Sequence, residues 1–165
     1  LGEGTCFTLT FEHRIADEEC IEMNQELDVL DEKSILQGKH VLLVEDNDLN
    51  AEIAMAILEQ SGLILDRVDD GLACVNRLSE VDEDLYDLIL MDIQMPNMNG
   101  YEATRRIRQF ANVKKASIPI LAMTANAFEE DKKMAMEAGM NGHISKPIDV
   151  NVLEKQIINI FKKVS

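Results

Sequence analysis

Polar residues that could do chemistry together follow four short strand-like runs along the chain. They are Glu45, Asp46, Asp92, Thr124 and Lys146. Three carboxylates held in a small space repel one another by several kcal/mol unless a cation neutralises them. Oxygen ligands of this kind suit Mg²⁺, which takes one or two carboxylates, a carbonyl and several waters. If the fold brings the four run ends together, this set predicts a magnesium site, with Lys146 as a second, fixed positive charge.

Each of these residues also has a purely structural interpretation when it is taken alone. Asp92 or Asp46 could cap a following helix, Thr124 could be a strand hydroxyl, and Lys146 could be a surface amine. Their common position at the ends of successive runs is what favours the chemical interpretation.

The run Leu88–Met91 is too short for an independent helix, and turn-forming residues bound it, which is typical of a parallel strand buried on both faces. Similar strand-like segments alternate with helix-like segments from residue 39 onward, and five such units predict a doubly wound α/β fold. The expected order of its parallel sheet is 2-1-3-4-5, with a crevice between the first and third strands. The predicted strands are Lys39–Val44, Leu63–Val68, Tyr86–Met91, Ile118–Met123 and Asn141–Ser145. The predicted helices are Asp48–Ser61, Gly71–Glu80, Gly100–Asn112, Ala127–Ala138 and Val150–Lys163.

Composition narrows the class of protein. The chain has 165 residues and a formal net charge of -15, which argues against binding to nucleic acid or to an anionic membrane surface. No apolar run reaches the roughly 18 residues that a membrane helix needs. The three cysteines lack metal-ligand spacing, so we expect reduced thiols in a cytoplasmic compartment.

The first 37 residues differ from the rest of the chain. In residues 1–15 apolar and threonine side chains alternate as in a half-buried strand, and residues 16–37 form a strongly acidic stretch. That stretch is either a solvated linker or a short amphipathic helix. We therefore expect an appendage, a connector and one domain over residues 38–165.

The chain from residue 38 onward resembles a response-regulator receiver domain, which has a flavodoxin-like fold. The resemblance rests on four motifs in order: Val-Leu-Leu-Val-Glu-Asp-Asn from Val41, Met-Asp-Ile-Gln-Met-Pro-Asn-Met-Asn-Gly from Met91, Met-Thr-Ala-Asn-Ala from Met123, and Ser-Lys-Pro from Ser145. Gly-Glu-Gly-Thr-Cys-Phe from Gly2 resembles the end of a histidine-kinase ATP-binding domain. This order of segments is similar to that of hybrid sensor histidine kinases.

The resemblance implies a role for each site residue. Asp92 would be phosphorylated by a phosphohistidine, Lys146 would pair with Asp92 and then with the phosphoryl oxygens, and Thr124 would hydrogen-bond the phosphoryl group. Mg²⁺ would be held by Asp46, Asp92 and the backbone carbonyl of Gln94, with Glu45 acting through water.

The resemblance also implies a cis peptide bond between Lys146 and Pro147. One position departs from the family pattern. His143 stands where the family usually has Tyr or Phe, a ring that moves inward together with the threonine. His143 is therefore either a switch residue or a half-exposed strand histidine without a switching role.

Two functions follow as expectations. In the first, the chain is a two-component receiver that takes a phosphoryl group from a histidine kinase core and passes it to a histidine phosphotransfer domain. In the second, it is a receiver-shaped module that docks on its own kinase and regulates it without phosphotransfer. A DNA-binding regulator is not expected, because no basic helix is present. Kinase catalysis is not expected either, and the chain would catalyse only its own Mg²⁺-dependent phosphorylation and dephosphorylation. We expect it to lie in the cytoplasm without direct membrane contact, even if the parent protein is membrane-anchored.

Overall fold

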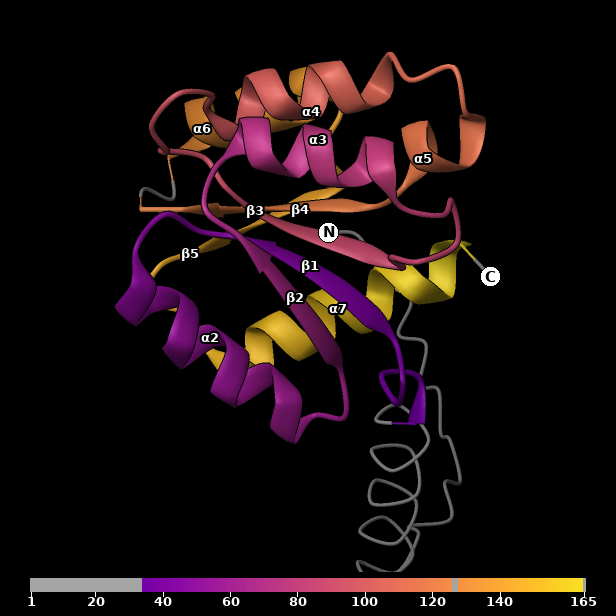
Figure 1. Cartoon of the computed structure of the whole chain (residues 1–165). Helices are drawn as coiled ribbons and strands as arrows, with labels where there is room; N and C mark the ends of the chain where they lie inside the picture. The colour runs from indigo at the N-terminus through magenta and orange to yellow at the C-terminus, as the bar shows by residue number, and fades with distance from the viewer. Residues whose placement is uncertain (1–33, 126–127, 165) are drawn as a thin grey trace, which may run out of the picture. The chain divides into compact units, whose positions relative to one another are not determined.

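The computed structural model describes residues 34–125 and 128–164, which form one α/β unit (Figure 1). The predicted residues 1–15 and most of the predicted linker 16–37 lie outside the described part. The strands are β1 (His40–Val44), β2 (Ile64–Val68), β3 (Leu88–Asp92), β4 (Ile120–Thr124) and β5 (Gly142–Ser145). The helices are α2 (Asp48–Gln60), α3 (Gly71–Glu80), α4 (Gly100–Arg108), α5 (Val113–Ser117), α6 (Glu129–Ala138) and α7 (Val150–Val164).

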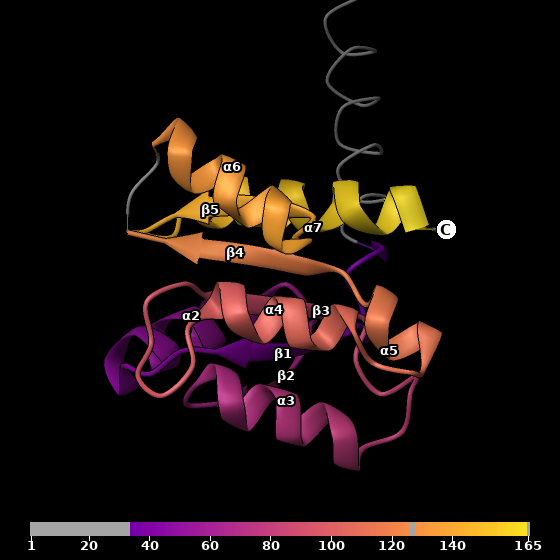
Figure 2. The same cartoon turned by 90° about the horizontal axis from the view of Figure 1, so that it is seen from above.

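The strands form one parallel sheet in the order β2-β1-β3-β4-β5, as the sequence predicts. All residues of β3 and β4 are buried, because helices cover both faces of the sheet. Helices α2 and α7 lie on one face, and α3, α4, α5 and α6 lie on the other (Figure 1). Seen from above, α4 lies between α3 and α6 (Figure 2). The carboxyl ends of β1, β3 and β4 therefore meet at one edge.

The two helical layers build two aliphatic cores. On the face covered by α2 and α7, Leu43 and Leu90 pack with Leu58 and Ile157. Leu36, which belongs to the predicted linker, is completely buried in the same core. Burial of a large aliphatic side chain contributes about 1.5–3 kcal/mol, so these positions dominate the free energy of folding.

Asparagine and aspartate side chains begin the helices nearest the carboxyl edge of the sheet. The Oδ1 atoms of Asn47, Asp70 and Asn99 each accept a hydrogen bond from a backbone N–H in the first turn of α2, α3 and α4. These caps set the point at which each helix begins beside the site.

The segment after α4 differs from the sequence prediction. A helix was expected from Gly100 to Asn112, but α4 ends at Arg108 and a short additional helix, α5, follows. Asn112 is the reason, because its Oδ1 accepts a hydrogen bond from Lys115 N and so begins α5. An N-cap residue has a non-helical backbone, here with φ −76° and ψ 114°, so a helix from Gly100 cannot include Asn112.

Candidate functional site

The site begins with Asp92, the last residue of β3. Its side chain is buried at the carboxyl edge of the sheet, where β3 lies between β1 and β4. Gly100 allows the chain to turn closely beneath it, since a Cβ at that position would lie 2.3 Å from the carbonyl oxygen of Asp92. The apolar strand and the glycine together hold the carboxylate at a fixed place.

Lys146 reaches Asp92 from the end of β5. Its Nζ lies 2.7 Å from Oδ2 of Asp92 and 2.5 Å from Oε2 of Glu45. The backbone N of Lys146 donates to the carbonyl oxygen of Thr124 at 2.7 Å, and the Lys146–Pro147 peptide is cis, as the resemblance implies. One ammonium group thus bridges carboxylates from β3 and from the end of β1.

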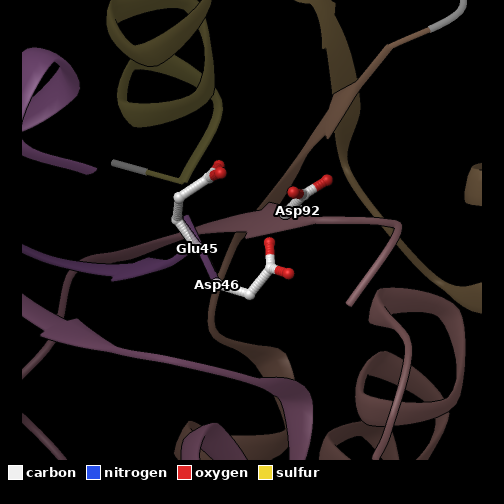
Figure 3. Close-up of side chains that lie close together, drawn as sticks. All are labelled: Glu45, Asp46 and Asp92. Carbon is white, nitrogen blue, oxygen red and sulfur yellow. The ribbon is translucent and has the colours of Figure 1, made fainter. Parts of the chain in front are cut away.

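Three carboxylates gather at this edge. Glu45 and Asp92 are buried and Asp46 is exposed, yet one oxygen of each lies within 4.8 Å of the others. Figure 3 shows the carboxylate of Asp46 turned toward that of Asp92, with Glu45 on the other side of the end of β1. The structure therefore brings together the acidic residues that the sequence singled out.

Burial has the largest effect on the pKa of the Asp92 carboxylate. It raises the pKa of Asp92, and the negative charge of Glu45 raises it further, while Lys146 and the N–H of Gln94 oppose the rise. Burial lowers the pKa of Lys146, but its hydrogen bonds to Asp92 and Glu45 together outweigh this effect, so that the pKa is raised overall. Lys146 is therefore a fixed positive charge, and negative charge at the site exceeds positive charge.

The other predicted residues occupy defined places around this centre. Gln94 is exposed, and its backbone N donates to Oδ1 of Asp92 at 3.2 Å. Thr124 is the buried last residue of β4 and lines a hollow of about 400 Å³ together with Met95 and Tyr101.

His143 lies in β5, paired in register with Ala122, and is half-buried. Burial lowers the pKa of His143, and Lys132 lowers it further, whereas Glu129 opposes the change. The ring is therefore neutral at neutral pH. Its place on a strand beside β4 agrees with either of the two roles that the sequence leaves open.

Two further residues, neither of which the sequence pattern indicates, hold Glu45. Asn50 Nδ2 donates to Oε1 of Glu45 at 3.0 Å, and the guanidinium of Arg67 donates to the carbonyl oxygen of Glu45 at 3.2 and 3.3 Å. Arg67 belongs to β2, which pairs with β1, so its contribution depends on the sheet order. Asn50 is in the first turn of α2, three residues after the N-cap Asn47.

No helix within residues 34–125 and 128–164 is both long and apolar enough to cross a bilayer.

A family model and two curated relatives point to the same protein family. A model of the response regulator receiver domain matches residues 41–158. The hybrid signal transduction histidine kinase L of Dictyostelium discoideum is 42% identical over 118 residues, which are 70% of this chain and 7% of that protein. The sensor protein GacS of Pseudomonas syringae is 37% identical over 123 residues, 74% of this chain and 13% of that protein.

A solved structure of a receiver domain is also similar to this chain in sequence and fold. The receiver domain of a sensor histidine kinase from Pseudomonas aeruginosa, with a magnesium ion coordinated in its active-site cleft, is 37% identical with a TM-score of 0.65. The alignment covers 75% of this chain and 97% of that one. The present chain spans 7% and 13% of the length of the two curated relatives named above, and 12% and 14% of the length of two probable histidine kinases of rice that it also matches. The chain belongs to the response regulator receiver domain family, and the proteins that it resembles include a hybrid histidine kinase and the receiver domain of a sensor histidine kinase.

Proposed function

We propose that this receiver takes a phosphoryl group from a phosphohistidine onto Asp92, with Mg²⁺, and relays it to a histidine phosphotransfer domain. The observation that carries the proposal is that Asp92 belongs to a cluster of three carboxylates and also lies 2.7 Å from the ammonium group of Lys146. A carboxylate is a weak nucleophile, so its catalysis depends mainly on positioning and charge neutralisation.

The residues present fit a magnesium ion. Glu45, Asp46 and Asp92 offer clustered carboxylate oxygens with only one ammonium group in contact among the described residues, which is the donor chemistry that Mg²⁺ prefers. Asp46, Asp92 and the backbone carbonyl of Gln94 would hold the ion, and Glu45 would act through water. When bound, the ion would neutralise the charge that develops between the carboxylate and the phosphoryl oxygens.

The transfer itself exchanges one bond for another. An oxygen of Asp92 attacks phosphorus in line, a P–O bond forms, and the P–N bond to the donor imidazole breaks. The imidazole keeps the electron pair and takes up a proton from solvent. Lys146 then moves its hydrogen bond from Asp92 to a phosphoryl oxygen, and the hydroxyl of Thr124 donates to another.

The partner should dock beside Lys146. Glu45, Asn50, Ile53, Lys146, Pro147 and Ile148 line a hollow of about 170 Å³ there. Ile53 is 52% exposed, and nearby Leu49 in the same helix is 65% exposed. Met95 does not line this hollow but the one beside Thr124. An apolar contact suits a chain with a net charge of -15, because another strongly acidic surface would be repelled.

The parent protein is the second part of the proposal. We propose that residues 1–15 are the end of a histidine-kinase ATP-binding domain, that 16–37 form a linker, and that 38–165 are the receiver of a hybrid kinase and lie in the cytoplasm. Support comes from the motif beginning at Gly2 and from relatives named as histidine kinases. These N-terminal residues are not required for the proposed chemistry at Asp92.

The test uses a radiolabelled phosphohistidine donor and Mg²⁺. The wild-type chain should acquire a base-labile acyl phosphate, Asp92→Asn should acquire none, and both should have the same circular dichroism spectrum. Asp84→Asn is the matched control, because Asp84 is an exposed carboxylate outside the site. A wild-type chain that binds the kinase but takes no label would instead support the regulatory docking module.

A further inference from the structure

The loop that follows the acceptor strand, residues 93–99, is bonded to a turn far away in the sequence. Oδ2 of Asp70, at the start of α3, accepts a hydrogen bond from Nδ2 of Asn97 at 2.6 Å. Oδ1 of the same carboxylate accepts from the backbone N of Ala73 at 2.7 Å. One carboxylate therefore caps α3 with one oxygen and holds the acceptor loop with the other.

A second contact brings the same two segments together. The backbone N of Gly71 donates to the carbonyl oxygen of Met98 at 3.2 Å. A Cβ on Gly71 would lie 2.6 Å from that oxygen, so a side chain there would push the segments apart. The absence of a side chain at Gly71 is what lets Asp70 reach Asn97.

The loop needs such support because its turn is strained. Asn97 has a φ of +56°, and Met98 N donates to Pro96 O at 2.6 Å, which closes a tight three-residue turn around Asn97. Residues other than glycine rarely adopt positive φ, and asparagine is among those that tolerate it best. A strained conformation persists when surrounding contacts hold it, and the side chain of Asn97 makes one of these.

The same loop touches the acceptor. Gln94 N donates to Oδ1 of Asp92, and Gly100 N donates to Ile93 O at 3.0 Å, so both ends of the loop are tied to the end of β3. A shift of the loop would therefore move the backbone of Gln94 relative to the carboxylate of Asp92. The carbonyl proposed to bind Mg²⁺ belongs to the same residue.

We propose that Asp70 is a positioning residue for Asp92, acting through Asn97 and the acceptor loop. This role rests on the proposed function of Asp92 as phosphoryl acceptor. Asp70 does not touch the reacting groups; it fixes the loop that supplies an N–H group to Asp92 and the carbonyl proposed for the metal. The alternative is that Asp70 serves only as the N-cap of α3.

The carboxylate of Asp70 is suited to this contact. The pKa of Asp70 is lowered, first by the backbone N–H of Ala73 and then by the amide of Asn97. The group is therefore ionised at neutral pH, and charge-assisted hydrogen bonds of this kind are stronger than neutral ones.

The test is a charge-swap series. Asn97→Asp places two carboxylates opposite each other and breaks the contact. The double variant Asp70→Asn with Asn97→Asp restores it with reversed polarity, because the amide introduced at position 70 can still cap α3 through its oxygen and donate through its nitrogen. Asp70→Ser keeps a good cap but is too short to reach Asn97. Asn112→Gly is the control, since it removes an asparagine-to-carboxylate contact, with Glu83, outside the site.

Three quantities are measured on the full chain: the dissociation constant for Mg²⁺ by calorimetry, the initial rate of labelling by acetyl phosphate, and hydrogen exchange of the Gln94 amide without metal. Asn97→Asp and Asp70→Ser should each weaken Mg²⁺ binding and slow labelling by about tenfold, as is usual for outer residues that orient metal ligands. Exchange of the Gln94 amide should accelerate. The charge-swapped double variant should return all three to within about twofold of wild type.

The proposal is wrong if Asn97→Asp matches Asn112→Gly in all three measurements, or if the swap fails to restore them. Asp70 would then be a helix cap alone. A wild-type chain that acetyl phosphate does not label would overturn the proposed function of Asp92 instead. In that case the exchange of the Gln94 amide along the series would still decide whether Asp70 positions the loop.

Discussion

Lys146 Nζ lies 2.7 Å from Oδ2 of Asp92 although the two residues are 54 positions apart in the sequence. Their side chains are 20% and 8% exposed, so solvent screens the pair only partly. Glu45, the second carboxylate in contact with the ammonium group, is buried as well. Among the described residues, the lysine is thus the one cation in direct contact with the two buried carboxylates.

Lys146→Gln should destabilise the chain by about 2 kcal/mol at neutral pH, because it leaves the carboxylates of Asp92 and Glu45 buried without a counter-ion. Labelling by acetyl phosphate should also slow by about tenfold or more, since the phosphoryl oxygens lose a positive charge. Urea unfolding and initial labelling rates measure the two effects. Lys133→Gln, at an exposed position on α6, is the control and should change neither the free energy of unfolding nor the labelling rate. Equal stability of the two variants would show that Lys146 is not needed to compensate the carboxylates.

Asp46→Ala should raise the dissociation constant for Mg²⁺ by about tenfold or more, because one carboxylate and one carbonyl rarely hold this ion. Asp48→Ala is a matched control two residues away, with a carboxylate that contacts Arg67 and lies outside the acidic cluster. Calorimetric titration at constant ionic strength measures the Mg²⁺ dissociation constants of both variants. If the two variants bind Mg²⁺ equally well, Asp46 is not a ligand.

Ile53→Glu should slow transfer from a phosphohistidine protein domain by about tenfold while leaving labelling by acetyl phosphate unchanged, because the small donor needs no docking surface. Ile64→Glu is the control, since Ile64 is 51% exposed against 52% for Ile53 but lies on the edge strand β2. Equal slowing with both donors would mean that Ile53 supports the fold or the site itself, and the docking surface would have to be sought elsewhere.

Cys74 should resist alkylation in the folded chain. Burial raises the pKa of its thiol to about 12, with a further contribution from the negative charge of Asp70, and the thiolate is the reactive form. Mass spectrometry of the peptide that contains Cys74 should show modification about 100-fold slower in native buffer than in denaturant. Similar rates under both conditions would show that α3 opens readily.

Tyr86→Phe should raise the pKa of Asp66 toward its ordinary value of 3.8. The hydroxyl of Tyr86 donates to Oδ2 of Asp66 at 2.6 Å, and this hydrogen bond is the main reason why the pKa of Asp66 is lowered. Burial raises the pKa of Asp66, whereas Arg77 and His40 lower it further. Because the folded-state pKa is lowered, this contribution to stability is present above the unfolded-state pKa and is lost as pH falls through the folded-state value. The Tyr86→Phe variant should therefore lose less stability than wild type on acidification.

Carboxyl chemical shifts, followed by NMR as a function of pH, measure this change residue by residue. Asp70 is an internal control, because its pKa is lowered by Ala73 and Asn97 and not by Tyr86. An unchanged titration of Asp66 in Tyr86→Phe would refute the assignment to the tyrosine hydroxyl.

The sequence by itself determined the sheet and the positions of the candidate site residues along it. A short, fully apolar run such as Leu88–Met91 between turn-forming residues favours a strand covered on both faces, and Asp92 is the first residue beyond the apolar part. Parallel strands also place their carboxyl ends at one edge, so Glu45, Asp46, Asp92 and Lys146 could be expected near one another before any coordinates were known.

The tertiary structure alone decided which of these groups touch and what holds them. Lys146 contacts Glu45 across 101 positions and Asp70 contacts Asn97 across 27, and neither pair has a local spacing that a periodic pattern would show. Arg108, the last residue of α4, likewise donates to the carbonyl oxygens of Gly139, Ala116 and Ile118, and these contacts exist only in the assembled fold. Local propensity governs where an element begins, whereas hydrogen bonds between distant segments depend on the assembled sheet.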